Sequence, residues 1–175
     1  ASFSDVFVAD EAIGRISGDL SMSGDALTLK FEAASPRLAV SGAGRIDMTE
    51  AMNADVTFLV NDTSLDPYFR AFQPRLSPFT TAIASGRIHV VGDLANIDRL
   101  RVDGEVDKVD LSLFDYKLHN AAPIKIALEG STVRVTEMRL AGDGTELDLS
   151  GVVTLDDQQI TARASGAANL GVLQG

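Results

Sequence analysis

A cluster of carboxylates in the middle of the chain has residue types that can bind a hard cation. The cluster consists of Asp103, Glu105, Asp107 and Asp110. On a strand, the first three of these side chains project to the same face. A calcium site also needs backbone carbonyls from a loop and a glycine at a fixed position, and the surrounding sequence offers neither. The pattern therefore favours a solvated strand face over a metal site.

The two histidines are the other candidates for chemistry, because histidine is the side chain that changes charge closest to neutral pH. His89 alternates out of phase with Ile88 and Val90, so we expect it to face solvent from a strand; His119 stands alone. The chain has no Gly-x-Ser-x-Gly elbow, phosphate loop, His-Glu-x-x-His motif or dinucleotide-binding glycine pattern. It also has no Trp to line a sugar cleft. The sequence therefore predicts no enzyme, no catalytic residue, no metal ligand and no cofactor.

The composition narrows the classes of partner. With 25 acidic and 15 basic residues, the net charge is −10. A nucleic-acid-binding protein needs a basic stripe, and none is present; the same charge disfavours an anionic lipid surface. Because the chain contains no Cys, disulfides, thiolate catalysis and zinc–sulfur sites are excluded.

Alternation of apolar and polar residues is the main structural signal. Hydrophobic residues make up 45% of the chain, and Val, Ile, Leu and Ala dominate them. The clearest alternating runs are residues 38–47 and 147–156, and such runs predict strands with one apolar and one wet face. Further strands are predicted in 13–60, 87–94, 100–113, 124–129, 132–140, 146–155 and 159–165. The fold class is therefore all-β, with an antiparallel sheet.

Local features divide these strands. The apolar phase of Val102 and Val106 changes before Val109, which predicts a bulge or tight turn near Asp107 and Lys108. The composition of Gly130-Ser131 and of residues 142–145 (Gly-Asp-Gly-Thr) is typical of hairpin turns.

The alternation is interrupted over residues 63–85. Thr63 or Ser64 can cap a helix and Pro67 suits its first turn, whereas Pro74 ends it. We therefore predict one short helix near 65–73.

The interruption separates two related units, at about 1–62 and 86–175. Residues 38–47 and 147–156 match each other at six positions, and a Gly-Arg-Ile precedes a Gly-Asp-Leu in both units. Such internal matches suggest stacked, repetitive architecture. Because the chain starts at Ala1 without Met, we expect residues 1–175 to be a single fragment of a longer protein whose membrane anchor or export signal lies elsewhere.

An antiparallel sheet with one wet face must cover its other face. A second sheet would make a sandwich, closure would make a filled barrel, and partial curling would leave an apolar groove. A parallel β-helix is a further alternative. Alternation alone does not choose among these architectures.

Several segments resemble one known family. They are a Gly-x-Ile/Leu-x-Val-x-Gly strand from Gly86, an Asn-x-x-Pro-Ile step at Asn120, Pro123 and Ile124, and a Gly-x-Gly-Thr-x-Leu-x-Leu-x-Gly turn and strand that starts at Gly142. The last pattern continues through Gly144, Thr145, Leu147, Leu149 and Gly151. In these patterns the chain resembles the translocation and assembly module B (TamB) family, within the wider AsmA-like group. The resemblance covers residues 60–175 well and 1–60 loosely.

The resemblance implies a long, curved antiparallel sheet folded like a taco around an apolar groove. It implies a periplasmic segment of a protein anchored in the inner membrane of a diderm bacterium. Such proteins are implicated in moving phospholipid to the outer membrane, and TamB members also in assembling outer-membrane proteins with a barrel partner. The expected partners are therefore phospholipid acyl chains or nascent outer-membrane β-strands, with the barrel partner bound by regions outside this fragment.

The candidate groove-lining residues all belong to the apolar phase of the predicted strands, and ordinary core packing is the alternative for each of them. They are Leu27, Leu29, Phe31, Val56, Phe58, Ile88, Val90, Leu100, Val102, Val106, Ile124, Ile126, Leu128, Val133, Val135, Leu147, Leu149, Val153 and Leu155.

Overall fold

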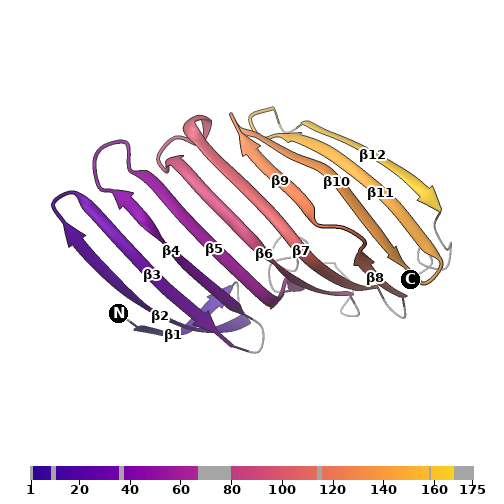
Figure 1. Cartoon of the computed structure of the whole chain (residues 1–175), viewed down its shortest axis with the longest axis horizontal. Helices are drawn as coiled ribbons and strands as arrows, with labels where there is room; N and C mark the ends of the chain where they lie inside the picture. The colour runs from indigo at the N-terminus through magenta and orange to yellow at the C-terminus, as the bar shows by residue number, and fades with distance from the viewer. Residues whose placement is uncertain are drawn as a thin grey trace.

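The described part of the chain forms one layer of antiparallel strands (Figure 1). The computed structural model describes residues 2–8, 11–35, 38–66, 80–113, 116–157 and 159–167. The strands are β1 (Ser2–Val8), β2 (Glu11–Ser23), β3 (Ala26–Ala34), β4 (Ala39–Asp47), β5 (Asn53–Ser64), β6 (Thr80–Asp93), β7 (Leu100–Leu113), β8 (Tyr116–Asn120), β9 (Ile124–Glu129), β10 (Thr132–Gly142), β11 (Thr145–Thr154) and β12 (Gln159–Ala167). A 3-10 turn, η1 (Ile97–Arg99), precedes β7. The predicted all-β fold and antiparallel sheet are confirmed.

The strands follow one another in chain order from β1 to β12, with one exception. Between β7 and β10, β8 and β9 lie end to end, and each of them pairs with both neighbours. Residues 121–123 separate β8 from β9 and end in Pro123, which has no N–H to donate to a ladder. The two short strands therefore act as one strand with an interruption.

Two-residue turns set the register of several hairpins. Glu129 pairs with Thr132, and Gly142 pairs with Thr145, so both predicted hairpin turns are confirmed. Gly130 and Ser131 have φ values of 54° and 57°, and Asp143 and Gly144 have 47° and 74°. Positive φ at both central residues is the requirement of the type I′ turn, whose twist matches that of the strands it joins.

The bulge predicted near Asp107 and Lys108 is present in β7. Gly86 pairs with Val106, whereas the preceding residue, Ser85, pairs with Lys108, so Asp107 is the extra residue. Val106 and Val109 consequently project to the same face of the sheet, although three positions separate them. The bulge thus explains the change of apolar phase in the sequence.

Similar breaks occur at the same level of the neighbouring strands. The register shifts between Val60 and Thr63 of β5 and between Val135 and Met138 of β10. Together with Asp107 and the interruption at 121–123, these breaks form what we call the bulge line. It crosses β5 to β10 roughly perpendicular to the strands. The sequence did not predict its parts in β5 and β10.

Asn120 holds two parts of the bulge line together. Its Oδ1 accepts a hydrogen bond from the Val109 N–H at 2.6 Å, and its Nδ2 donates to the carbonyl oxygens of Asp107 and Ala122 at 3.0 and 2.9 Å. One side chain therefore pairs three backbone groups that the two interrupted ladders leave free.

The predicted helix near 65–73 lies mostly outside the described residues. At its start, the Leu65 N–H donates to the Ala82 carbonyl, and the Asp66 carboxylate accepts from the Ala82 N–H, both at 2.8 Å. β5 extends to Ser64 and β6 begins at Thr80, so both strands run into the range where the interruption is expected.

An Ala substitution for Asn120 tests the bulge line. Asn120→Ala leaves the Val109 N–H and two carbonyls without a protein partner, so we expect a loss of about 1–3 kcal/mol in the free energy of unfolding. His119→Ala, at the neighbouring exposed position, is the control. Chemical denaturation measures stability, and amide hydrogen exchange at Val109 reports the local effect. If the Val109 amide were equally protected from exchange in Asn120→Ala, the role of Asn120 in joining the two parts of the bulge line would be contradicted.

A pair of glycines tests packing on the sheet. An ideal Cβ on Gly42 would lie 2.4 Å from Cε1 of the Phe31 ring, whereas one on Gly104 would meet nothing closer than the Ile126 oxygen at 3.5 Å. We expect Gly42→Ala to lower the free energy of unfolding by about 1–2 kcal/mol, because the added methyl group overpacks against the Phe31 ring. Gly104→Ala should leave the free energy of unfolding unchanged or raise it by about 0.5–1 kcal/mol, because alanine lowers the conformational entropy of the unfolded chain. Thermal and urea unfolding distinguish them, and equal effects would refute the packing argument.

Candidate functional site: an apolar sheet face

The strand register assigns side chains to the two faces of the sheet. Directly opposite residues of an antiparallel pair project to the same side. Starting from Leu29, the pairings therefore trace one cross-strand row over ten strands, which we call the central row. Its members are Leu20, Leu29, Gly44, Val56, Val90, Val102, Leu128, Val133, Val153 and Ile160. The row is apolar throughout and spans about 43 Å at the usual strand spacing of ~4.8 Å.

The rows on either side of the central row are also apolar. Phe31, Phe58, Ile88, Ile126 and Val135 share the next row with Gly42, Gly104 and Gly151. We call the side of the sheet that carries these rows the apolar face. It holds all the candidate groove-lining residues except Leu155, which lies in the turn after β11. The structure thus brings the other predicted residues together on one surface.

Burial on the apolar face is uneven. Val56 and Ile124 are 5% and 1% exposed, and most other predicted residues are half-buried. At the edge strand β12, Ile160 is 74% exposed, and Ile88 in the middle of the sheet is also exposed. An extended apolar surface of this kind usually marks a site for a partner, ligand or membrane.

One part of the apolar face is hollowed. The hollow has a volume of about 310 Å³ and lies over β2 to β6. Its lining residues are Leu20, Leu29, Phe31, Ile46, Ala54, Val56, Phe58, Val90 and Leu94, and no polar side chain is among them. The Phe31 and Phe58 rings pack against each other with centroids 5.8 Å apart and planes tilted by 58°. We refer to this feature as the apolar hollow.

Sequence reasoning missed several residues of the apolar hollow. Leu20 and Ile46 continue the alternation of their strands, and Ala54, two positions before Val56, faces the same side of the sheet. The signal was therefore present for these three. Leu94 lies in the turn after β6, where alternation gives no information.

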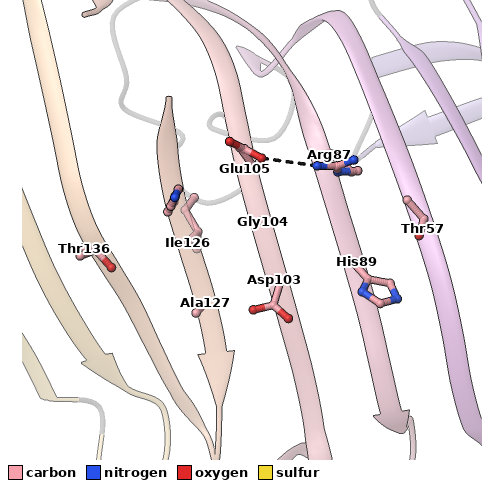
Figure 2. Close-up of a pocket in the computed structure, with 10 residues that line it drawn as sticks. Thr57, Arg87, His89, Asp103, Gly104, Glu105, Ile126, Ala127 and Thr136 are labelled. Atoms are coloured by element: carbon pink, nitrogen blue, oxygen red, sulfur yellow. Dashed lines mark hydrogen bonds and ion pairs between the residues drawn. The ribbon is translucent and has the colours of Figure 1, made fainter. Parts of the chain in front are cut away.

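The opposite side, the polar face, carries ionisable side chains and a wide hollow (Figure 2). This hollow has a volume of about 610 Å³ and is lined by Thr57, Arg87, His89, Asp103, Glu105, Lys125, Ala127 and Thr136. Gly104 and Ile126, which the register assigns to the apolar face, also border it. Arg87 and Glu105 are 3.4 Å apart and directly opposite on β6 and β7. Exposed ion pairs of this type contribute little to stability, typically about 0–1 kcal/mol each.

His89 faces outward on the polar face, where the alternation placed it. Its Nε2 lies 2.8 Å from Oδ1 of Asp55, and it is directly opposite Asp103. Thr57, its opposite residue on β5, makes no hydrogen bond to His89 in the described structure. A histidine beside carboxylates can exchange protons, but nucleophilic catalysis also needs an aligned hydroxyl or thiol.

Two carboxylates of the predicted cluster form ion pairs with arginine side chains. Oδ2 of Asp103 lies 3.0 Å from Nε of Arg101, and Glu105 forms an ion pair with Arg87. Asp107 is the extra residue of the β7 bulge. Among the described residues, no group of three or more His, Cys, Asp or Glu side chains is placed to hold a metal ion.

Among the described residues, the ion-pair network that shifts pKa values is that of Lys108. Its Nζ lies 3.1 Å from both Asp62 on β5 and Asp110 on its own strand. Hydrogen bonding to Lys108 lowers the pKa of Asp62, and hydrogen bonding to Asp62 raises the pKa of Lys108. The Ser85 hydroxyl also contacts Asp62, at 3.3 Å. This network joins the bulges of β5 and β7 on the polar face.

A scan against protein-family models, a search of curated proteins and a search of solved structures found no match for this chain. The likeness to the TamB family therefore rests on the sequence patterns alone. The helical structure within the described ranges has neither the length nor the apolarity of a membrane span.

Proposed function

We propose that the chain is a segment of a periplasm-spanning hydrophobic groove that moves phospholipid between the inner and outer membranes, assists outer-membrane protein assembly, or does both. The observation that carries this proposal is the central row, which stays apolar over ten consecutive strands. A path for acyl chains needs such continuity, because one polar position would interrupt it.

The energetics of an acyl chain suit this surface. Each buried methylene contributes about 0.8 kcal/mol, so a lipid tail gains on the order of 10 kcal/mol on leaving water. Movement along the face also requires that this gain change little with position, because a single deep site would trap the lipid. Val, Leu and Ile occupy nearly every position of the central row, and side chains of similar size give similar contacts.

The bulge line supports curvature of the sheet into a groove. Bulges bend the strand that carries them and increase its twist. Because the bulge line crosses β5 to β10 at one level, its bends add along a line parallel to the central row. A taco-like fold needs such a crease along its length.

The cellular setting follows from the sequence resemblance. We place the segment in the periplasm, as part of an inner-membrane-anchored protein of a diderm bacterium. The outer-membrane barrel partner would bind regions outside this chain. Acyl chains, or the apolar faces of nascent outer-membrane β-strands, would occupy the apolar face.

A structural or interaction module that transports nothing is the alternative. A parallel β-helix requires parallel strand pairs, whereas every pairing in the described ranges is antiparallel. In a β-sandwich, a second sheet would cover the apolar face and leave no room for lipid. The two functions thus differ in what contacts Val102.

A photo-crosslinker at two adjacent positions tests the proposal. Val102 lies in the central row, and Asp103 lies on the polar face opposite His89. In the full-length protein in cells, we expect a crosslinker at Val102 to form lipid adducts and one at Asp103 to form few, because only the first faces the acyl path. Mass spectrometry identifies the adducts. Equal labelling at both positions, or none at either, would contradict the groove.

A further inference from the structure

The turns at one end of the sheet form a connected border. The Met48 N–H donates to the Asp25 carbonyl at 2.6 Å, and the Leu94 N–H donates to the Met52 carbonyl at 3.3 Å. These bonds join the turn after β2, the turn after β4 and the turn after β6. We call residues 24–25, 48–52 and 94–99 the turn rim.

The turn rim exposes large apolar side chains, although turns usually carry small and polar residues. Met48, Met52, Leu94 and Ile97 are all exposed. Leu94 also lines the apolar hollow, together with the exposed Leu20 of β2. The apolar hollow is therefore continuous with the turn rim and open to solvent there.

The charges of the turn rim are predominantly acidic. Asp25, Glu50 and Asp98 are exposed, and Arg99 is the one basic residue in the three segments. The net charge of the chain, −10, adds to the same negative potential. An anionic group at the turn rim would be repelled, and a group carrying a cation would be attracted.

We propose that the apolar hollow binds one acyl chain of a lipid whose headgroup lies at the turn rim, and that the acidic turn rim selects zwitterionic or neutral headgroups over anionic ones. The inference rests on the proposed function, because it assumes that the apolar face binds acyl chains. It adds a position on the acyl path that is open to solvent at the turn rim, and so does not trap the lipid, and the class of lipid that is accepted there.

The lining favours an acyl chain over a peptide. The apolar hollow lies on the face of the sheet, where the backbone groups of β3 to β5 are already paired in ladders on both sides. A peptide there would bury its own N–H and C=O groups without partners, which costs free energy for each group. An acyl chain has no such groups.

The size of the hollow favours a single chain. Its 310 Å³ lies at the lower end of the usual range for ligand cavities, about 300–1,000 Å³. A lipid with one tail is therefore the appropriate probe of binding to the apolar hollow. A second copy of the sheet face is the competing occupant.

The test compares two lipids that differ only in their headgroup. The full chain is titrated with 12-carbon lysophosphatidylcholine and with 12-carbon lysophosphatidylglycerol, both below their micelle concentrations, and binding is followed by methyl NMR. We expect the zwitterionic lipid to bind about 3–10-fold more tightly at low salt. The difference should shrink in 0.5 M NaCl, since salt screens exposed charges. Equal affinities at low salt would overturn the headgroup selection.

Two leucine variants locate the bound chain. Leu94→Ser should weaken lysophosphatidylcholine binding several-fold. Leu59→Ser should not, because Leu59 is similarly exposed (46% against 42%) but lies opposite Arg87 on the polar face. Equal effects of the two variants would overturn the placement.

Failure of the inference and failure of the proposed function give different results. Lipid adducts from Val102, combined with binding that Leu94→Ser leaves unchanged, overturn only the placement in the apolar hollow. No binding of either lipid and no adducts from Val102 overturn both. If sedimentation shows a dimer that lysophosphatidylcholine does not dissociate, the second copy occupies the face and the inference fails.

Discussion

The whole structure depends on keeping one set of side chains on one face of the sheet. A slip of one residue in any pairing would move that strand's apolar side chains to the polar side. The three bulges of the bulge line preserve the phase: Val60 and Thr63, Val106 and Val109, and Val135 and Met138 are each three positions apart yet share the apolar face. The register therefore shifts at the bulge line without mixing the two faces of the sheet.

The two faces contribute unequally to stability. On the polar face, exposed ion pairs and hydrogen bonds link side chains of different strands, such as His89 with Asp55 and Lys108 with Asp62. Solvent and salt weaken these interactions. The apolar face supplies most of the burial, including that of Val56 and Ile124. It is still left partly open, so the surface that stabilises the sheet is also the surface available to a ligand.

Much of this arrangement could be predicted from the sequence, because period-two alternation encodes both the strands and their faces. Leu147 and Leu149, for example, share a face as their spacing requires. The bulge at Asp107 was visible because the apolar residues change phase there. The break in β5 was not, since Asn61 and Asp62 look like ordinary wet positions until the pairing of Thr63 with Ala84 is known. The role of Asn120 depends on contacts with residues across the interruption, which spacing does not reveal, and the same is true of Leu94 in the apolar hollow.

The most direct test of the account asks which methyl groups an acyl chain approaches. The full chain, with labelled Val, Leu and Ile methyls, is mixed with lysophosphatidylcholine that carries a nitroxide on its tail. We expect the methyl signals of Val90, Val102 and Leu128 to broaden and those of Val91 and Val152 to stay sharp, because the register places the last two on the polar face. Equal broadening of Val90 and Val91, which are adjacent in β6 and differ only in the face they occupy, would contradict it.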